Sequence, residues 1–193
     1  HALTFIQRVA DESINPSSGL PFDSHRDDGW VLEGWWYDQL SMRGHSGYLV
    51  GQALYYVLEA YEYERELAGV EHADWLAFVD RVLERTERSR NADGEYPYVL
   101  SDRSGAGIEY DAMAGAWCLA AAVYHDRLVG REDRRSEHER SERHYFDTYV
   151  ARMECYGAPH DTEKAIDSEG VIAYVKAVQQ LHRATGRDEL LDR

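Results

Sequence analysis

Three helix-length apolar segments of the same design constrain the fold more than any other feature of the sequence. They are residues 48–69 (YLVGQALYYVLEAYEYERELAG), 111–130 (DAMAGAWCLAAAVYHDRLVG) and 169–186 (EGVIAYVKAVQQLHRATG). Each ends at a glycine, the residue best suited to the C-terminal cap of a helix. The final glycines are roughly 55 to 60 residues apart, a period typical of a two-helix repeat. The repeat predicts a series of helical hairpins.

A second series of helix-like segments alternates with the first, at residues 3–13, 74–90 and 144–154. The first series is apolar nearly all round, as in residues 114–124, whereas the second has one apolar stripe. In the middle copy this stripe consists of Trp75, Leu76, Phe78, Val79, Val82 and Leu83. The pattern predicts inner helices buried on both sides and outer helices with one solvated face. The run at residues 131–144 (REDRRSEHERSERH) alternates in charge and predicts a solvated outer helix or a linker.

The connections between the two series differ in length. From an inner helix to the next outer helix the chain needs only a short link, as at residues 69–74, whereas the reverse connections are long, at residues 15–47, 91–110 and 155–168. Long loops inside a compact domain are usually functional. These loops all lead into the N-terminal ends of inner helices, so we expect the functional residues on one face.

Charge and hydropathy exclude several kinds of partner. The net charge of -15 repels phosphate backbones and anionic lipids, and no basic patch offsets it. The longest apolar run, at residues 112–124, is too short to span a bilayer. We therefore expect neither nucleic acid nor a membrane as a partner. The chain does not open with the charged and apolar regions of a signal peptide, which favours a cytoplasmic location without settling the compartment.

The common cofactor motifs are missing from the sequence. It contains no GxGxxG, GxxxxGK[ST], GxSxG or HExxH, so dinucleotide, P-loop, α/β-hydrolase and zincin chemistry have no support. Cys118 and Cys155 form neither a disulfide framework nor a CxxC pattern. Glu154, Cys155 and His160 are zinc-ligand types without ligand spacing. We expect no metal and no cofactor.

The alternating helices, together with the turn DGEYPY at residues 93–98 and the loop CYGAPHDTEKAIDSEG at residues 155–170, resemble the six-hairpin glycosidases. The resemblance extends over residues 1–193 as one partial domain, and it implies an all-α fold, an (α/α) hairpin toroid of inner and outer helices. About three of six hairpins are present, about half of an (α/α)6 barrel. It also implies an oligosaccharide or polysaccharide substrate, and completion of the ring by a missing half or by a second copy in a homo-oligomer. Hairpin toroids also host epimerases, lyases and terpenoid cyclases.

Glycoside cleavage needs one group to protonate the leaving oxygen and a carboxylate to activate water or attack the sugar. Our first choices for this catalytic pair are Asp111 and Asp161, with Glu109 and Glu169 as reserves. All four precede or begin an inner helix. The roles of acid and base stay open, because they depend on which carboxyl group is buried.

A structural role is the alternative for the acidic groups beside the third inner helix. Asp167 or Ser168 would serve as an N-cap, and Glu169 as a first-turn acid stabilised by the helix dipole. The adjacent His160 and Asp161 suit acid–base work, although a loop histidine is more often simply solvated.

Aromatic residues are concentrated in the first long loop, where residues 27–48 contain three tryptophans and two tyrosines. Flat aromatic faces suit sugar rings, and the alternative is that Trp30, Trp35 and Trp36 plug the mouth of the barrel. The predicted substrate-binding residues are Trp35, Trp36, Tyr37, Arg43, His45, Tyr48, Tyr156, His160 and Lys164. Arg43 and Lys164 would bind the carboxylate of a uronic acid, or merely balance acidic neighbours.

The resemblance and the loops together predict a glycoside hydrolase. Two other functions stay open. A sugar epimerase similar to the N-acylglucosamine type would use His45 and His160 as proton-transfer bases. A non-catalytic helical-repeat scaffold would bind a protein partner along its concave face, where it would have little use for carboxylate-rich and aromatic loops.

Overall fold

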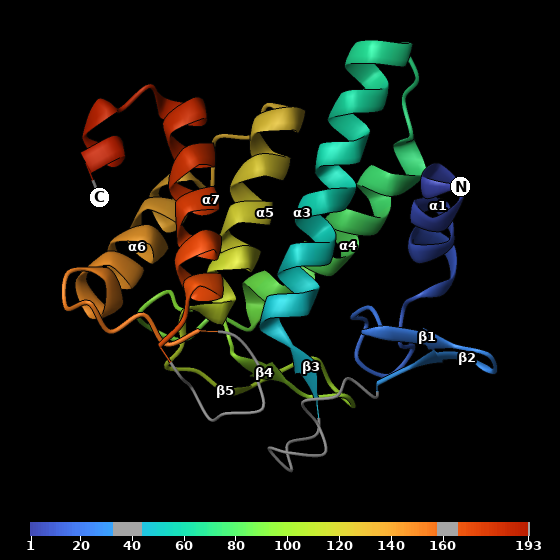
Figure 1. The fold of residues 1–193 in the computed structure, drawn as a ribbon, viewed down its shortest axis with the longest axis horizontal. Coiled ribbons are helices and arrows are strands. Elements are labelled where there is room, and N and C mark those ends of the chain that lie inside the picture. Colours follow the sequence, from blue (N-terminus) through green and yellow to red (C-terminus); the bar gives the residue numbers. More distant parts are fainter. Residues whose placement is uncertain (33–43, 158–165, 193) are drawn as a thin grey trace.

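The computed structural model describes residues 1–32, 44–157 and 166–192 and is mostly helical (Figure 1). Six α-helices lie in these ranges: α1 (Ala2–Glu12), α3 (Gly47–Tyr63), α4 (Ala73–Arg88), α5 (Ala116–Val129), α6 (Arg135–Tyr145) and α7 (Ser168–Thr185). Short helical turns extend or follow them: η1 (Glu64–Ala68), η2 (Met113–Gly115), η3 (Phe146–Val150) and η4 (Asp188–Asp192).

The helices form two layers. In the inner layer α5 packs between α3 and α7, as the first series of segments predicts. In the outer layer α4 packs on α3, α5 and α1, while α6 packs on α5 and α7. The order of inner and outer helices along the chain therefore follows the predicted alternation.

Small side chains bring the inner helices close together. Every residue of α5 from position 116 to position 126 is buried, and four of these eleven residues are alanine. On α3, a Cβ atom added to Gly51 would lie 2.4 Å from the backbone nitrogen of Cys118 and 2.5 Å from the carbonyl carbon of Trp117. The two backbones meet at this glycine. Although α5 is strongly apolar, no helix in the described ranges is both long and apolar enough to cross a membrane.

Replacing Gly51 by alanine is expected to lower the free energy of unfolding by about 1–3 kcal/mol, the usual cost of overpacking a core. The added methyl group meets backbone atoms, which have no rotamer to escape into. Urea unfolding monitored by circular dichroism measures the change. An unchanged midpoint would contradict the close packing of α3 on α5.

Five short strands in the described part of the chain correct the prediction of an all-α fold. β1 (Ser24–Arg26) and β2 (Gly29–Val31) form an antiparallel hairpin, and β3 (His45–Ser46), β4 (Val99–Leu100) and β5 (Gly107–Glu109) form an antiparallel sheet in the order β3-β4-β5. His45 pairs with Leu100, and Val99 pairs with Glu109. The sheet thus joins the ends of two loops that are far apart in the sequence, just before their inner helices.

The charged run at residues 131–144 forms an outer helix, one of the two predicted possibilities, but that helix is not solvated all round. Most of the run belongs to α6, which begins at Arg135 rather than at His144. One face of α6 is buried, and two of its polar side chains, Ser141 and Glu142, form hydrogen bonds there. The Tyr174 hydroxyl donates to Glu142 at 2.7 Å, and Ser141 donates to the carbonyl oxygen of Gly94 at 2.7 Å. This face of α6 can be buried because its polar side chains are hydrogen-bonded, and not because the side chains are apolar.

Candidate functional site

The N-terminal ends of α3, α5 and α7 lie on the same side of the molecule, beside the β3-β4-β5 sheet (Figure 1). The backbone nitrogen of Met113 in η2 donates to the carbonyl oxygen of Tyr156 at 2.8 Å. A Cβ atom on Gly170 would lie 3.0 Å from the Cα of Gly157 and 3.1 Å from the Cβ of Met113. The first turn of α7 therefore packs directly against η2, which leads into α5.

A buried carboxylate, Glu95, organises this face. It is only 4% exposed. Its Oε1 accepts hydrogen bonds from the backbone nitrogens of Asp111 at 2.8 Å and Ala112 at 3.1 Å, and from the Tyr149 hydroxyl at 2.6 Å. Its Oε2 lies 3.3 Å from Nε2 of His144. Glu95 thus joins the segment before α5 to α6 and η3 of the outer layer.

These contacts keep Glu95 ionised. Burial alone would raise the pKa of its carboxyl group, but hydrogen bonds from His144 and Tyr149 outweigh that effect and hold the pKa below its ordinary value of 4.5. Burial and the neighbouring Glu95 charge raise the pKa of the Tyr149 phenol far above its ordinary range. Glu95 is therefore suited to hold its neighbours in place and is not suited to donate a proton.

Asp111 is the exposed residue that Glu95 positions. Its φ of +68° lies in the left-handed region, which is uncommon for a residue other than glycine. A non-glycine residue keeps this strained backbone conformation only where its surroundings enforce it, and such residues are common at functional sites. The backbone nitrogen is fixed by Glu95, and Oδ1 lies 3.5 Å from the Tyr149 hydroxyl. The carboxylate predicted as a catalytic group is therefore exposed on a backbone held in one unusual conformation.

Aromatic side chains gather on the adjoining surface of the inner layer. Tyr48 makes an edge-to-face contact with Trp117, with 6.2 Å between ring centroids, and Tyr56 lies 5.9 Å from Trp117. The Tyr48 hydroxyl accepts from Nε2 of Gln52 at 3.1 Å. Burial, and then the negative charge of Glu169, raise the pKa of the Tyr48 phenol. Residues of α3, α5 and α7 thus come together at this point.

A pocket of about 200 Å³ adjoins the aromatic surface on the side of β1. Gln52 and Tyr56 of α3 line it together with Phe22 and Asp23. Tyr56 is 48% exposed. The pocket combines an accessible aromatic face with polar groups, a lining that suits a sugar ring.

His45, a predicted substrate-binding residue, is held inside the protein. It is 1% exposed, its Nδ1 donates to the carbonyl oxygen of Pro21 at 3.0 Å, and its Nε2 lies 2.7 Å from the Ser18 hydroxyl. Burial lowers the pKa of the imidazole to about 4, so the ring is neutral near pH 7. His45 is among the residues that line the pocket of about 200 Å³, but both ring nitrogens are engaged, so work as an epimerase base would require these bonds to break. In the described conformation His45 positions the start of α3.

Four other sequence candidates lie around the same face. Asp167 is the N-cap of α7, as the structural alternative predicts, because its Oδ1 accepts from the backbone nitrogens of Glu169 at 2.8 Å and Gly170 at 3.1 Å. Glu169 occupies the first turn of α7. Glu109 ends β5, where its carbonyl oxygen accepts from the backbone of the β4 segment. Tyr156 makes an edge contact with Tyr149, with centroids 6.5 Å apart, and so adjoins the Glu95 cluster.

The remaining sequence candidates lie outside the described residues. They are Trp35, Trp36, Tyr37, Arg43, His160, Asp161 and Lys164. Their predicted roles stay predictions.

Glu95, His144 and Tyr149 were not predicted as site residues. Glu95 belongs to the DGEYPY turn, whose only functional indication in the sequence is its resemblance to sugar-facing loops. His144 and Tyr149 occur in HYFDTYV, where their polar groups look like part of an ordinary outer helix. Glu95 is connected to His144 and Tyr149 only by hydrogen bonds between residues far apart in the sequence, so the sequence alone does not reveal the cluster.

Neither a protein-family model nor a curated protein matches the sequence. Within residues 1–32, 44–157 and 166–192, no three His, Cys, Asp or Glu side chains gather in a way that could hold a metal ion. The chemical groups of the described site are carboxylates, phenols, an indole and backbone amides.

Proposed function

We propose that the protein is a carbohydrate-active enzyme, a glycoside hydrolase that acts on an oligosaccharide or polysaccharide at the N-terminal ends of the inner helices. The observation that carries the proposal is Asp111, an exposed carboxylate whose strained backbone is fixed by the buried Glu95. Positioning of a reactive group by a rigid supporting residue is what general acid–base or nucleophilic catalysis requires.

A second carboxylate is needed to complete the reaction. Asp161 is the candidate from the sequence, and Glu169 is the described alternative, since its charge acts on Tyr48. In a retaining enzyme the two carboxyl groups are about 5 Å apart, and one of them attacks the sugar directly. In an inverting enzyme they are about 6.5–9.5 Å apart, and one of them activates a water that attacks the sugar. Asp111 serves as nucleophile in the first arrangement and as general base in the second.

The aromatic surface supplies the binding part of the site. Tyr48 and Tyr56 of α3 present the accessible aromatic groups, and the buried Trp117 of α5 packs behind both rings. Such surfaces pack against the apolar faces of sugar rings, while Gln52 offers an amide to hydroxyl groups. If Arg43 or Lys164 contributes a cation to the site, that cation would bind the carboxylate of a uronic acid, which makes a uronic acid the favoured sugar.

An activity screen tests the proposal. The purified protein is incubated with neutral and uronic-acid-containing oligosaccharides, and the release of new reducing ends is measured. We expect turnover of one linkage class. If no glycan is cleaved while a sugar is epimerised, the hydrolase proposal is wrong and the epimerase alternative takes its place, although the burial of His45 argues against the latter.

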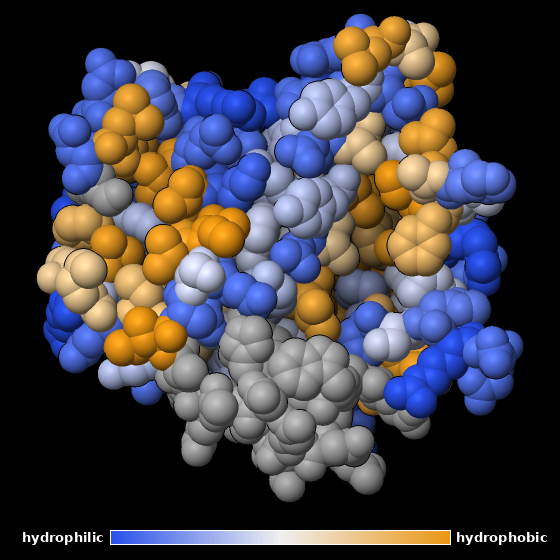
Figure 2. All heavy atoms as spheres, viewed as in Figure 1, coloured by the Kyte–Doolittle hydropathy of each residue, from blue (hydrophilic) through white to orange (hydrophobic). Residues whose placement is uncertain are grey.

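We further propose that the inner layer continues beyond α7 into a closed (α/α)6 toroid, completed by further helices or by a second copy. Support comes from α7, the last described inner helix, where Val171, Ile172 and Val175 are 40%, 49% and 54% exposed. Figure 2 shows apolar side chains gathered over this helix. An apolar helix face normally packs on a neighbour. Sedimentation equilibrium tests the second-copy form of this proposal, which a strictly monomeric protein would contradict.

A further inference from the structure

The accessible face of α3 continues well beyond the candidate sugar site. Gln52 and Tyr56 line the pocket beside β1, and the same side of the helix goes on to Glu59 and Tyr63 near its C-terminal end. At 3.6 residues per turn these four positions lie in one line along the helix, and together they are called the α3 stripe. Tyr61, on the opposite side of α3, is only 4% exposed. The α3 stripe is therefore the free face of this helix.

Two exposed aromatic rings stand in the α3 stripe. Tyr56 is 48% exposed and Tyr63 is 57% exposed. Their positions are about 10 Å apart along the helix axis. Scattered aromatic residues on a surface need no explanation. These two are in line with each other, and one of them already lines the pocket of the candidate site, so they extend its aromatic surface along α3.

The polar groups of the α3 stripe are available to a ligand. The hydroxyl groups of Tyr56 and Tyr63 and the carboxylate of Glu59 form no hydrogen bond with any described residue. Lys176 of α7 adds a donor close by, because its Nζ is 5.4 Å from the centroid of the Tyr55 ring. Sugar hydroxyls both donate and accept, so this mixture suits them. An apolar peptide would instead bury the Glu59 charge without a partner.

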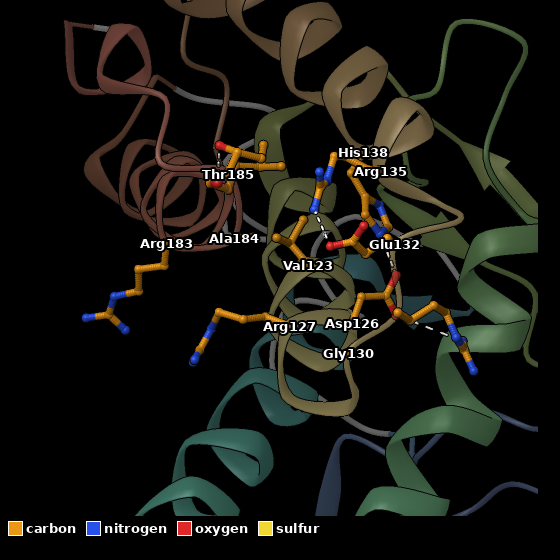
Figure 3. A pocket seen from close by; sticks show the side chains of 12 residues that line it. Val123, Asp126, Arg127, Gly130, Glu132, Arg135, His138, Arg183, Ala184 and Thr185 are labelled. Carbon is orange, nitrogen blue, oxygen red and sulfur yellow. Dashed lines mark hydrogen bonds and ion pairs between the residues drawn. The ribbon is translucent and has the colours of Figure 1, made fainter.

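Hydrogen bonds among the inner helices hold the layer behind the α3 stripe. The Tyr55 hydroxyl accepts from Nε2 of Gln180 at 3.0 Å, which joins α3 to α7. Nε of Arg127 donates to Gln180 at 3.2 Å, and its Nη2 donates to Glu62 at 2.9 Å, so α5 is joined to both neighbours. Arg127 and His138 line a pocket at the C-terminal end of α5, and Figure 3 shows Arg127 extending away from His138. A surface fixed in this way loses little entropy when it binds a ligand.

We infer that the α3 stripe binds further sugar units of the glycan that is cleaved at Asp111, so that the substrate is a long oligosaccharide or a polysaccharide. The inference rests on the proposed function. Tyr48, in the candidate site, and Tyr63 are about 22 Å apart along the axis of α3, a distance that a disaccharide cannot span. Ring faces of the tyrosines pack on sugar rings, and Glu59 accepts hydrogen bonds from sugar hydroxyls.

Binding measurements on the Asp111→Asn protein test the inference, because this variant leaves the ligand intact. The ligands are neutral and uronic-acid oligosaccharides of several linkage classes, each as a disaccharide and as a hexasaccharide. We expect the hexasaccharide of one class to bind at least about tenfold more tightly than its disaccharide, a difference of about 1.4 kcal/mol. Equal binding of the two lengths overturns the inference and leaves the proposed function standing.

If neither length of any class binds, the activity of the wild-type protein separates the two claims. Cleavage of a glycan by wild type then means that the inference alone is wrong. Absence of cleavage means that the proposed function is wrong as well.

Three substitutions in the same Asp111→Asn background locate the further sugar units. Tyr63→Ala removes the distal ring, and we expect the dissociation constant for the hexasaccharide to rise about tenfold while that for the disaccharide is unchanged. Tyr63→Phe keeps the ring and should retain most of the affinity. Phe5→Ala is the matched control, because it removes a ring from α1 that is also 57% exposed, and it should change neither constant. Unchanged hexasaccharide binding in Tyr63→Ala, or equal weakening of both ligands, contradicts the inference.

Discussion

Replacement of Asp111 by asparagine is expected to lower kcat/KM for the glycan substrate by about 10²- to 10⁴-fold, the usual contribution of a positioned acid–base group. Asparagine also tolerates the left-handed region, so the backbone at φ +68° is kept while the carboxylate is lost. The loss of activity is therefore chemical in origin. Steady-state kinetics, with circular dichroism as a check on folding, measures it.

The matched control is Asp93→Asn, which makes the same change on an exposed residue of the turn that contains Glu95. We expect this variant to keep its activity. Asp111→Ala adds a second comparison, because alanine in the left-handed region costs roughly 1–2 kcal/mol. It should lose both activity and stability. Full activity in the asparagine variant would remove Asp111 from the catalytic pair.

Replacement of Glu95 by glutamine is expected to lower the free energy of unfolding by about 2–3 kcal/mol, because it removes the charge of a buried carboxylate that accepts several hydrogen bonds. In the wild type the hydrogen-bond donors around Glu95 share two carboxylate oxygens, whereas the glutamine amide offers them one oxygen. The amide nitrogen would instead point N–H groups at His144 or at the other donors. Urea unfolding near neutral pH measures the loss. Glu84→Gln, on an exposed i,i+4 pair with Arg88, is the control and should cost at most about 1 kcal/mol.

The effect of Glu95 has a defined pH dependence. The folded-state pKa of Glu95 is held below the ordinary value of 4.5, so its stabilising charge is fully present above that value. It is lost as the pH falls through the lower pKa of the folded protein. The difference in stability between wild type and Glu95→Gln should therefore shrink in acid. If Glu95→Gln is as stable as wild type at neutral pH, the buried carboxylate does not hold the neighbouring segments in place and this part of the account is wrong.

Much of the fold is predictable because apolar periodicity reports burial directly. The all-round apolar pattern of α5 and the single stripe of α4 place them in the inner and outer layers without knowledge of any contact. The strands were missed because elements of two or three residues carry too little periodicity. The buried face of α6 was missed because His138 and Glu142 are polar, and only their partners Asp126 and Tyr174 make burial possible.

The candidate site was predictable in part for the same reason. Asp111 is visible from its position before an inner helix, since loops that lead into such helices meet on one face. Its unusual backbone and its dependence on Glu95 are not visible, because they arise from hydrogen bonds to residues distant in the sequence. His45 shows the opposite case. Its loop position suggests exposure, but Ser18 and Pro21 enclose it.

Thermal unfolding with a panel of neutral sugars and uronic acids tests most directly whether the N-terminal face of the inner helices binds carbohydrate. A ligand at 100 times its dissociation constant stabilises the folded state by about 2.7 kcal/mol, which is readily detected. We predict a rise in Tm confined to one class of sugar, and a smaller rise in Tyr48→Ala, which removes part of the aromatic surface. No shift with any sugar would contradict the account and would favour a scaffold that binds a protein partner.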